Sequence, residues 1–295
     1  MRASDQGLHR DDLDTGYTWR DLETADLDGA CRLSEALGWP HRREDWASLL
    51  TVGRGMALVH EGRLIGTGLC IPQGVLATIA LIVIDEAYRG LGLGKQMMTR
   101  VMALAGDLPM LLVATTAGAP MYEKFGFINR HPVAQYQGVA TAIDALGDPR
   151  VEDMQGADRE AIEHLAEAGS GRGAVLHATL AAAGAVKVYR DDQGDVVGFA
   201  VRRAFGKGEV IGPVVAHEQA EAEALVDALL AQATGRFVRM DILNDGLAAE
   251  WLAERGLQGV ARIIQMSRGE LPIPASDSGA THMLRQFTLT TQALG

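Results

Sequence analysis

The chain has 295 residues, and this length predicts two domains of ordinary size. Its 22% share of charged residues is typical of a globular protein, and its net charge of −11 argues against nucleic acid as a partner. The longest apolar run, 75–84, is much shorter than the roughly 20 residues that a membrane-spanning helix needs. An acid-rich beginning and only two cysteines, Cys31 and Cys70, without metal-ligand spacing, lead us to expect a cytoplasmic protein with no membrane segment and no metal.

Hydrophobic periodicity predicts a mixture of helices and strands in the first half of the chain. Two helices come first, and three strands and a long amphipathic helix follow them. The half ends with a strand, a short helix and a closing strand, so that the predicted elements are 27–37, 43–50, 56–60, 64–71, 75–84, 92–105, 110–114, 119–125 and 133–139.

The second half repeats this order, with a hairpin turn at 191–194. Its predicted elements are 158–168, 174–182, 186–189, 196–201, 209–215, 218–233, 237–242, 247–254 and 260–266, and 283–289 is a candidate for one more strand. Between the halves the polar stretch 144–153 contains glycine and proline and predicts a linker. Repetition at a period of about 140 residues indicates a tandem duplication of one α+β unit, with domains at 1–147 and 148–295.

The strongest chemical signal lies where the third strand meets the following helix. Residues 82–95 read Ile-Val-Ile-Asp-Glu-Ala-Tyr-Arg-Gly-Leu-Gly-Leu-Gly-Lys, an apolar strand that runs into a glycine-rich loop. The glycines at 90, 92 and 94 let backbone N–H groups approach an anion without a Cβ in the way. The helix adds the positive end of its dipole, and Arg89 and Lys95 add cationic side chains. The combination favours a pyrophosphate site over a purely structural turn.

Two familiar phosphate-binding loops do not fit this stretch. A Walker loop needs Ser or Thr where Gln96 stands and glycine where Arg89 stands. A dinucleotide fingerprint needs glycine three residues after Gly92, where Lys95 stands. The pattern that remains is Arg/Gln-x-x-Gly-x-Gly/Ala, with Arg89, Gly92 and Gly94 in its fixed places.

This pattern and its position resemble the GNAT superfamily of acyl-CoA-dependent N-acyltransferases, whose domain is a mixed, mostly antiparallel sheet flanked by helices. In that family the loop binds the pyrophosphate of CoA through backbone amides, which implies that role here for Arg89, Gly90, Leu91, Gly92, Leu93, Gly94 and Lys95. The strand before the loop carries a bulge and hydrogen-bonds the pantetheine arm. The resemblance therefore implies contacts with acetyl-CoA from Ile82, Val83 and Ile84.

A second match lies at 120–128, which read Pro-Met-Tyr-Glu-Lys-Phe-Gly-Phe-Ile. The segment resembles the family's Leu-Tyr-Glu-Lys-Leu-Gly-Phe motif, whose tyrosine is the usual general acid, and this implies that role for Tyr122. Thr115 stands where many members have an asparagine that contacts the cofactor, and we count it among the cofactor-binding residues. The stretches 115–118, 211–216 and 266–269 resemble a subgroup with a degenerate second GNAT-like domain at the C-terminus.

Acetyl transfer from a thioester to an amine needs a base for the amine, a donor for the oxyanion and a proton for the departing thiolate. A backbone N–H near Val83 on the bulged strand suits the second need, and the Tyr122 hydroxyl, with an ordinary pKa of about 10, suits the third. We nominate no base, because 75–84 contains no carboxylate, and water relayed to solvent is an alternative. Trp39, His41 and Trp46 are candidates for lining the pocket, although both tryptophans suit the core better.

We therefore expect an N-acetyltransferase in 1–147 that moves an acetyl group from acetyl-CoA to the amine of a small molecule by direct attack. The domain at 148–295 is expected to bind no CoA and to shape the acceptor pocket, because Gly212 is the only glycine at its junction and Pro213 lacks an N–H. The acidity of the chain favours solubility, and it would also attract a cationic acceptor. Two other classes stay open: a catalytically silent acyl-CoA-binding sensor, and an interaction protein that uses the duplicated domain to form a homodimer.

Overall fold

The structure, a computed structural model, describes residues 16–141, 147–170, 173–271 and 284–294. Every helix and strand predicted for the first half is present. This half also has an edge strand that was not predicted, because it is only five residues long and most of its side chains are exposed. Its elements are β1 (Tyr17–Asp21), η1 (Thr24–Asp26), α1 (Leu27–Glu35), α2 (Arg43–Val52), β2 (Arg54–His60), β3 (Arg63–Pro72), β4 (Ala77–Ile84), η2 (Glu86–Tyr88), α3 (Leu93–Ala103), β5 (Met110–Ala114), α4 (Ala119–Glu123) and β6 (Ile128–Val139).

The second half repeats this order, as the sequence predicts. Its elements are β7 (Val151–Asp153), η3 (Gly156–Asp158), α5 (Arg159–Ser170), α6 (Gly173–Ala181), β8 (Ala183–Arg190), β9 (Val196–Phe205), β10 (Gly208–Ala216), α7 (Gln219–Ala231), β11 (Phe237–Leu243), α8 (Ala249–Glu254), β12 (Gln258–Arg268) and β13 (Arg285–Thr288). The prediction of a linker over 144–153 is wrong at its end, because β7 pairs with β8. Residues 142–146 of that stretch lie outside the described residues.

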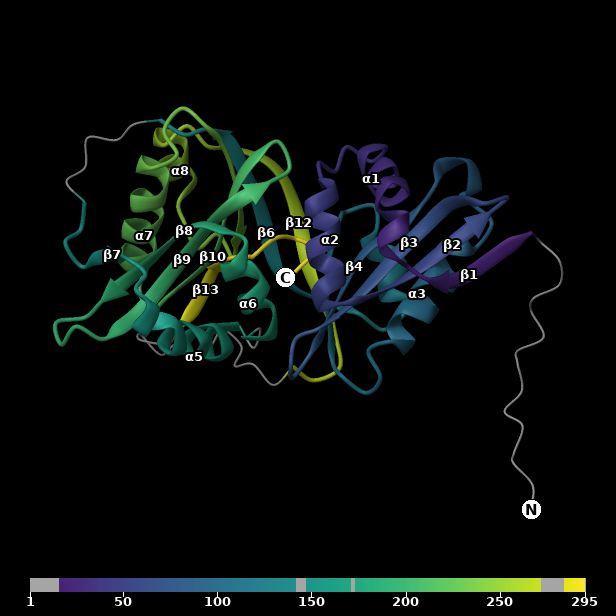
Figure 1. Cartoon of the computed structure of the whole chain (residues 1–295), viewed down its shortest axis with the longest axis horizontal. Helices are drawn as coiled ribbons and strands as arrows, with labels where there is room; N and C mark the ends of the chain where they lie inside the picture. The colour runs from purple at the N-terminus through teal and green to yellow at the C-terminus, as the bar shows by residue number, and fades with distance from the viewer. Residues whose placement is uncertain (1–15, 142–146, 171–172, 272–283, 295) are drawn as a thin grey trace, which may run out of the picture.

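The strands of the described chain form one sheet in the order β1-β2-β3-β4-β5-β12-β6-β11-β13-β10-β9-β8-β7. At the centre of this order the two halves exchange strands. The second-half strand β12 pairs with β5, whereas the first-half strand β6 pairs with β11. β12 and β6 also pair with each other, and they run between the two lobes in Figure 1. Backbone hydrogen bonds therefore join the halves, in addition to side-chain packing.

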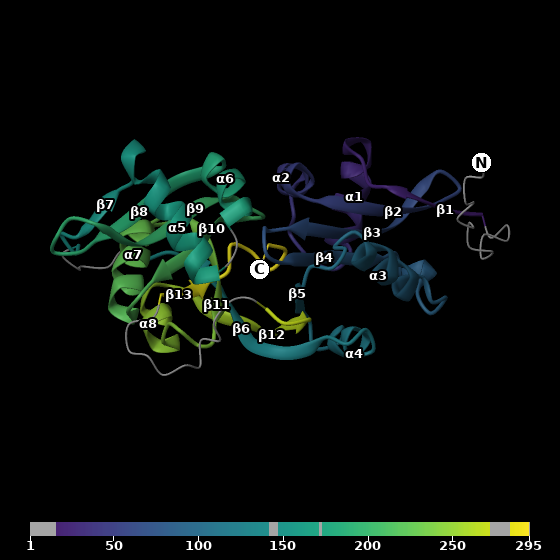
Figure 2. The ribbon, with the colours of Figure 1, turned by 90° about the horizontal axis from the view of Figure 1, so that it is seen from below.

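Helices cover the sheet of the first half on both sides, with α1 and α2 on one side and α3 on the other (Figure 2). α3 presents Met97, Met98 and Val101, at helical spacing, to the buried core. On the opposite side Trp46 is fully buried, and its indole Nε1 donates a hydrogen bond of 3.3 Å to Ser34. Trp46 is therefore a core residue, as the sequence favours.

The last described residues cross from the second half into the first and lie between the lobes (Figure 1). The backbone N–H of Leu289 donates to the carbonyl of Asp241 at 2.9 Å. Farther on, Ala293 and Leu294 pack into the core beneath α1 and α2, and Gln73 Nε2 donates to the Leu294 carbonyl at 2.8 Å. This C-terminal segment, 289–294, therefore forms part of the seam between the halves.

Candidate active site

The glycine-rich loop lies between β4 and α3, where the sequence places it. Gly90 and Gly92 have φ angles of 80° and 76°, which glycine adopts without strain. A Cβ built on either residue would meet no atom within 4 Å, and one on Gly94 would lie 3.9 Å from Ile84 and from Met121. Among the described residues, the amides of 90–94 donate to no carbonyl group. Unpaired amides at an open helix start form a binding site for an anion.

β4 carries a bulge just before this loop. Leu81 has a φ of 50°, which is uncommon for a residue other than glycine, and the register of β4 against β3 shifts at the same place. β4 and β5 pair in parallel only at their first two residues, and then separate. The part of β4 that follows has no partner strand on the β5 side among the described residues. Its backbone groups are therefore free to pair with an extended ligand that contains amides.

The predicted cofactor-binding residues of β4 lie along this free stretch. Val83 is buried, whereas Ile82 and Ile84 are half-buried. Arg89 is exposed, and its Nε donates to the Ile84 carbonyl at 3.2 Å, which holds the guanidinium beside the end of β4. The structure thus brings the cationic side chain and the strand end together.

The other predicted residues differ in what they can offer a ligand. Leu91 and Lys95 are exposed, whereas Leu93 is 3% exposed and can offer only its backbone. Thr115 is exposed at the end of β5, and its hydroxyl accepts a hydrogen bond of 3.1 Å from the Gly118 amide. This bond fixes the turn into α4 and leaves the hydroxyl proton of Thr115 available as a donor.

A cavity of about 280 Å³ opens where β4 and β5 separate, and we name it the acceptor cavity. The first half supplies the bulge of β4 and a group of polar and aromatic side chains, Trp39, His41, Thr115 and Tyr122. The second half supplies Phe205, Arg239, Ala261, Ile263 and Gln292. Sequence reasoning did not find these second-half residues, because strand exchange brings them here and no motif marks them.

Tyr122 lies on α4 and faces the acceptor cavity. Its ring packs edge-on against Phe127, with the ring centroids 6.2 Å apart. Burial raises the pKa of Tyr122 to about 12, so the hydroxyl keeps its proton at neutral pH. A protonated phenol in this position can donate a proton to a group in the cavity.

His41 lies in an aromatic cluster at the edge of the same cavity, 5.4 Å from the Phe205 ring centroid. Burial lowers the pKa of His41 to about 4; Asp45 opposes this shift, and Arg239 and Arg203 add to it. Its Nδ1 is buried without a hydrogen-bond partner in the described residues. His41 is therefore neutral at pH 7 and a weak base.

The pKa of His41 predicts a loss of stability at mildly acidic pH. The unfolded chain takes up a proton at His41 below pH of about 6.5, whereas the folded chain does so only near pH 4. The free energy of unfolding should therefore fall by up to about 3 kcal/mol between these pH values. Denaturant titrations between pH 5 and 7 should show this slope in the wild type and in the exposed control His164→Gln, and a smaller slope in His41→Phe. Equal slopes in all three proteins would contradict the assignment.

The equivalent junction of the second half is closed by the chain itself. β10 and β11 pair in parallel only at Glu209 and Val210 and then separate, as β4 and β5 do. β13 fills the gap and pairs with both strands. Gly212 and Pro213 lie within β10 and not at the junction with α7, so the expectation that placed them at the junction is wrong. A Cβ built on Gly212 would overlap the carbonyl oxygen of Leu289, so the C-terminal segment packs directly against β10. The free strand edge of the first half therefore has no counterpart here.

Comparison with known proteins agrees with this architecture. Two family profiles, each described as an acetyltransferase (GNAT) domain, match residues 53–129 and 164–279. The chain belongs to the GNAT acetyltransferases. The first match contains the loop and Tyr122, and the second covers most of the half whose groove β13 fills. This GNAT protein is thus a tandem α+β protein, as its sequence predicts.

Individual relatives support the same assignment. The uncharacterized N-acetyltransferase YitH of Bacillus subtilis is 26% identical over 242 residues, which are 76% of this chain and 81% of YitH. A candidate acetyltransferase from Pyrococcus horikoshii has a similar structure, with a TM-score of 0.77 at 17% identity over 99% of this chain and all of that one. A tandem GNAT protein from the clavulanic acid biosynthesis pathway has a TM-score of 0.58 at 12% identity, over 85% of this chain and 98% of its own. At these identities the structures establish the fold alone.

The part of the chain that the structure describes has neither a membrane-spanning helix nor a metal-binding cluster. None of the helices there is long and apolar enough to cross a membrane. In the same residues, no three His, Cys, Asp or Glu side chains are grouped so that they could hold a metal ion.

Proposed function

We propose that this GNAT protein transfers the acetyl group of acetyl-CoA, the co-substrate of the family, to the amine of a small molecule. The reaction would take place in the domain at 1–147, and 148–295 would be a degenerate second domain that completes the acceptor cavity. One observation carries the proposal: the position of Gly94 between Ile84 at the end of β4 and Met121 on α4. The open loop, the free edge of β4 and the helix of Tyr122 meet at this residue.

In this proposal the amides of 90–94 hold the pyrophosphate, and Arg89 and Lys95 add positive charge around it. The free edge of β4 at Ile82, Val83 and Ile84 pairs with the amides of the pantetheine arm, as an added strand would. Thr115 contacts the cofactor from the end of β5. A pantetheine arm in this place points its thioester into the acceptor cavity.

The residues around the thioester have separate roles in the reaction. Acetyl-CoA supplies the carbonyl that the amine attacks and the thiolate that leaves. A backbone N–H beside the bulge, near Val83, stabilises the oxyanion, and Tyr122 gives its proton to the departing sulfur. With a pKa of about 4, His41 is too weak a base at pH 7 to serve, so water relayed to solvent takes the proton of the amine.

The test incubates the protein with acetyl-CoA and a panel of small amines. Acetylation is measured as the release of the free thiol of CoA. Turnover of an amine that Tyr122→Phe strongly reduces would support the proposal. Tight CoA binding without turnover of any amine would favour the silent sensor. A chain that binds no acyl-CoA and forms a homodimer would favour the interaction protein.

We predict one acetyl-CoA site per chain. The second half offers no free strand edge, because β13 lies between β10 and β11, and Pro213 contributes no N–H to the edge of β10. Equilibrium dialysis with radiolabelled acetyl-CoA should therefore give a stoichiometry of one, and Gly92→Val should remove that binding. A stoichiometry of two, or full-affinity binding that survives in Gly92→Val, would contradict the assignment.

A further inference from the structure

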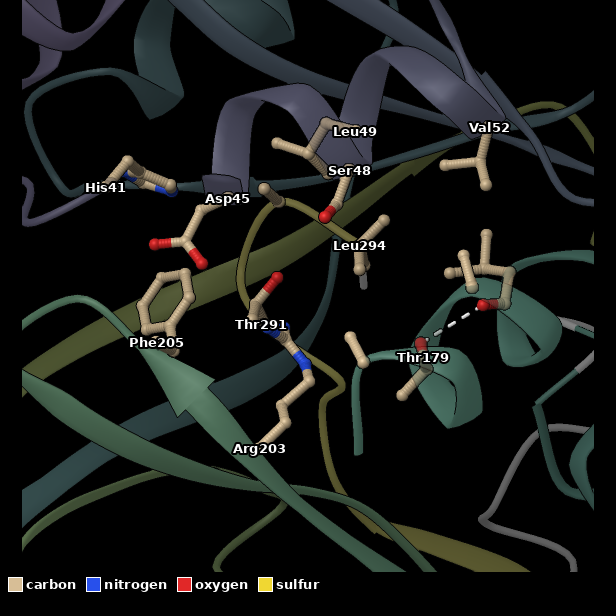
Figure 3. Close-up of a pocket in the computed structure, with 14 residues that line it drawn as sticks. His41, Asp45, Ser48, Leu49, Val52, Thr179, Arg203, Phe205, Thr291 and Leu294 are labelled. Carbon is tan, nitrogen blue, oxygen red and sulfur yellow. Dashed lines mark hydrogen bonds between the residues drawn. The ribbon is translucent and has the colours of Figure 1, made fainter. Parts of the chain in front are cut away.

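A second, smaller cavity adjoins the acceptor cavity at the seam, and Arg203 extends into it (Figure 3). The cavity has a volume of about 30 Å³, which holds about two water-sized groups. α2, β9, α6 and the C-terminal segment enclose it. His41, Phe205 and Ala293 line both cavities, so the two spaces adjoin at these shared residues.

Arg203 is a buried cation that forms no ion pair with a carboxylate in the described residues, although its guanidinium lies over the Phe205 ring, 5.5 Å from the ring centroid, and is attracted by the charge of Asp45. The residue is 8% exposed, and its hydrogen bond, from Nη1 to the carbonyl of the neighbouring Ala204, is long at 3.5 Å. Burial lowers the pKa of its guanidinium. A buried charge with no ion pair is costly for a folded protein, so a position of this kind calls for an explanation.

The neighbouring charges at the seam are already paired. Asp45 faces the same cavity, but it forms an ion pair of 2.9 Å with Arg42 and accepts a hydrogen bond of 3.2 Å from the Gly206 amide. Arg239, on the side of the acceptor cavity, forms an ion pair of 3.0 Å with Asp241. Together Arg42, Asp45, Arg203, Arg239 and Asp241 therefore carry one positive charge in excess. That charge belongs to Arg203.

The cavity also offers a second donor beside Arg203. Thr291 is 2% exposed, and it lines the same cavity as Arg203 (Figure 3). The Thr179 hydroxyl, by contrast, already donates to the Val175 carbonyl at 3.0 Å. A guanidinium and a hydroxyl that line one space for two oxygen-sized atoms match the size, charge and acceptor character of a carboxylate.

We infer that Arg203, together with Thr291, binds a carboxylate at the seam, in a site next to the acceptor cavity. The carboxylate belongs either to the acceptor, which would then be a molecule with both an amine and a carboxylate, or to a separate small anion. The net charge of the whole chain is negative, and a negative charge favours a cationic acceptor. The local charge at this site has the opposite sign. At the seam the uncompensated charge is positive.

The first test uses formate as the probe and needs no catalysis. The proteins are the wild type, Arg203→Met, and Lys207→Met, which removes the same charge from the exposed turn between β9 and β10. Sodium formate should raise the Tm of the wild type and of Lys207→Met by a few °C more than that of Arg203→Met. Without formate, Arg203→Met should be at least as stable as Lys207→Met, because it no longer buries an unpaired charge. An equal formate response in all three proteins, or a less stable Arg203→Met, would overturn the inference.

The second test identifies the source of the carboxylate, and it rests on the proposed function. It compares acetylation of amino acids with that of the amines that lack only the carboxylate. If the acceptor supplies the carboxylate, Arg203→Met lowers kcat/KM for the amino acid about 10- to 100-fold and leaves the simple amine unchanged. Formate then competes with the amino acid. If formate binds without competing with the amino acid, the carboxylate belongs to a separate anion. If the chain acetylates no amine, the proposed function is refuted, but the formate test still shows whether the carboxylate site exists.

Discussion

A Gly94→Val chain is expected to fold normally and to bind acetyl-CoA at least about tenfold more weakly than the wild type. Gly94 has a helical conformation in the first turn of α3, so valine introduces no positive-φ strain. A Cβ there lies at ordinary contact distance from Ile84 and Met121, and the added methyl groups enter the space assigned to the cofactor. Calorimetric titration with acetyl-CoA measures the effect.

Two controls separate lost space from a disturbed backbone. Gly156→Val places a valine at a glycine that also has room for a Cβ and no positive φ, far from the loop. Gly106→Val is the matched control for Gly92→Val. Both glycines have a positive φ and an open Cβ position, but only Gly92 lies in the loop. Both controls should bind acetyl-CoA normally. Unchanged affinity in a folded Gly94→Val protein would remove the loop from the cofactor site.

Tyr122→Phe is expected to lower kcat by about 10²–10⁴ while the affinity for acetyl-CoA changes little. The substitution keeps the ring against Phe127 and removes only the hydroxyl, so the fold and the cavity should be preserved. Because the pKa of Tyr122 is raised to about 12, this hydroxyl stays protonated over the accessible pH range. Its titration should therefore cause no loss of rate between pH 7 and 10.

The matched control is Tyr136→Phe, which removes the hydroxyl of a buried tyrosine on β6 that does not line the acceptor cavity. Steady-state rates and calorimetric affinities of both variants separate catalysis from binding. A Tyr122→Phe enzyme within about twofold of the wild-type kcat would return Tyr122 to a packing role.

The local elements and the glycine-rich loop could be predicted because each has a short-range cause. The apolar side chains of α3 recur at helical spacing, and Gly92 adopts the positive φ that ends the loop. The edge strands β1 and β7 have short or mostly exposed sequences, which give no comparable signal. The sequence therefore predicts the interior of the sheet better than its edges.

The pairing of β12 with β5 could not be predicted, because two similar strands compete for the same place. β6 and β12 are the closing strands of the two repeats, and apolar alternation does not tell which of them pairs with β5. Cavity residues such as Arg239 and Ile263 depend on this exchange. The excess charge of Arg203 depends in turn on which carboxylates the fold brings near it. These features arise from long-range contacts and not from any local motif.

The most direct test of the proposed cofactor site is a crystal structure of the chain with acetyl-CoA bound. We expect one molecule per chain, with its pyrophosphate on the amides of 90–94 and its pantetheine arm along β4 at Ile82, Val83 and Ile84. Its thioester would face Tyr122 in the acceptor cavity. Acetyl-CoA bound in the second half between β10 and β11, or bound in the first half with its thioester away from Tyr122, would contradict the proposed function.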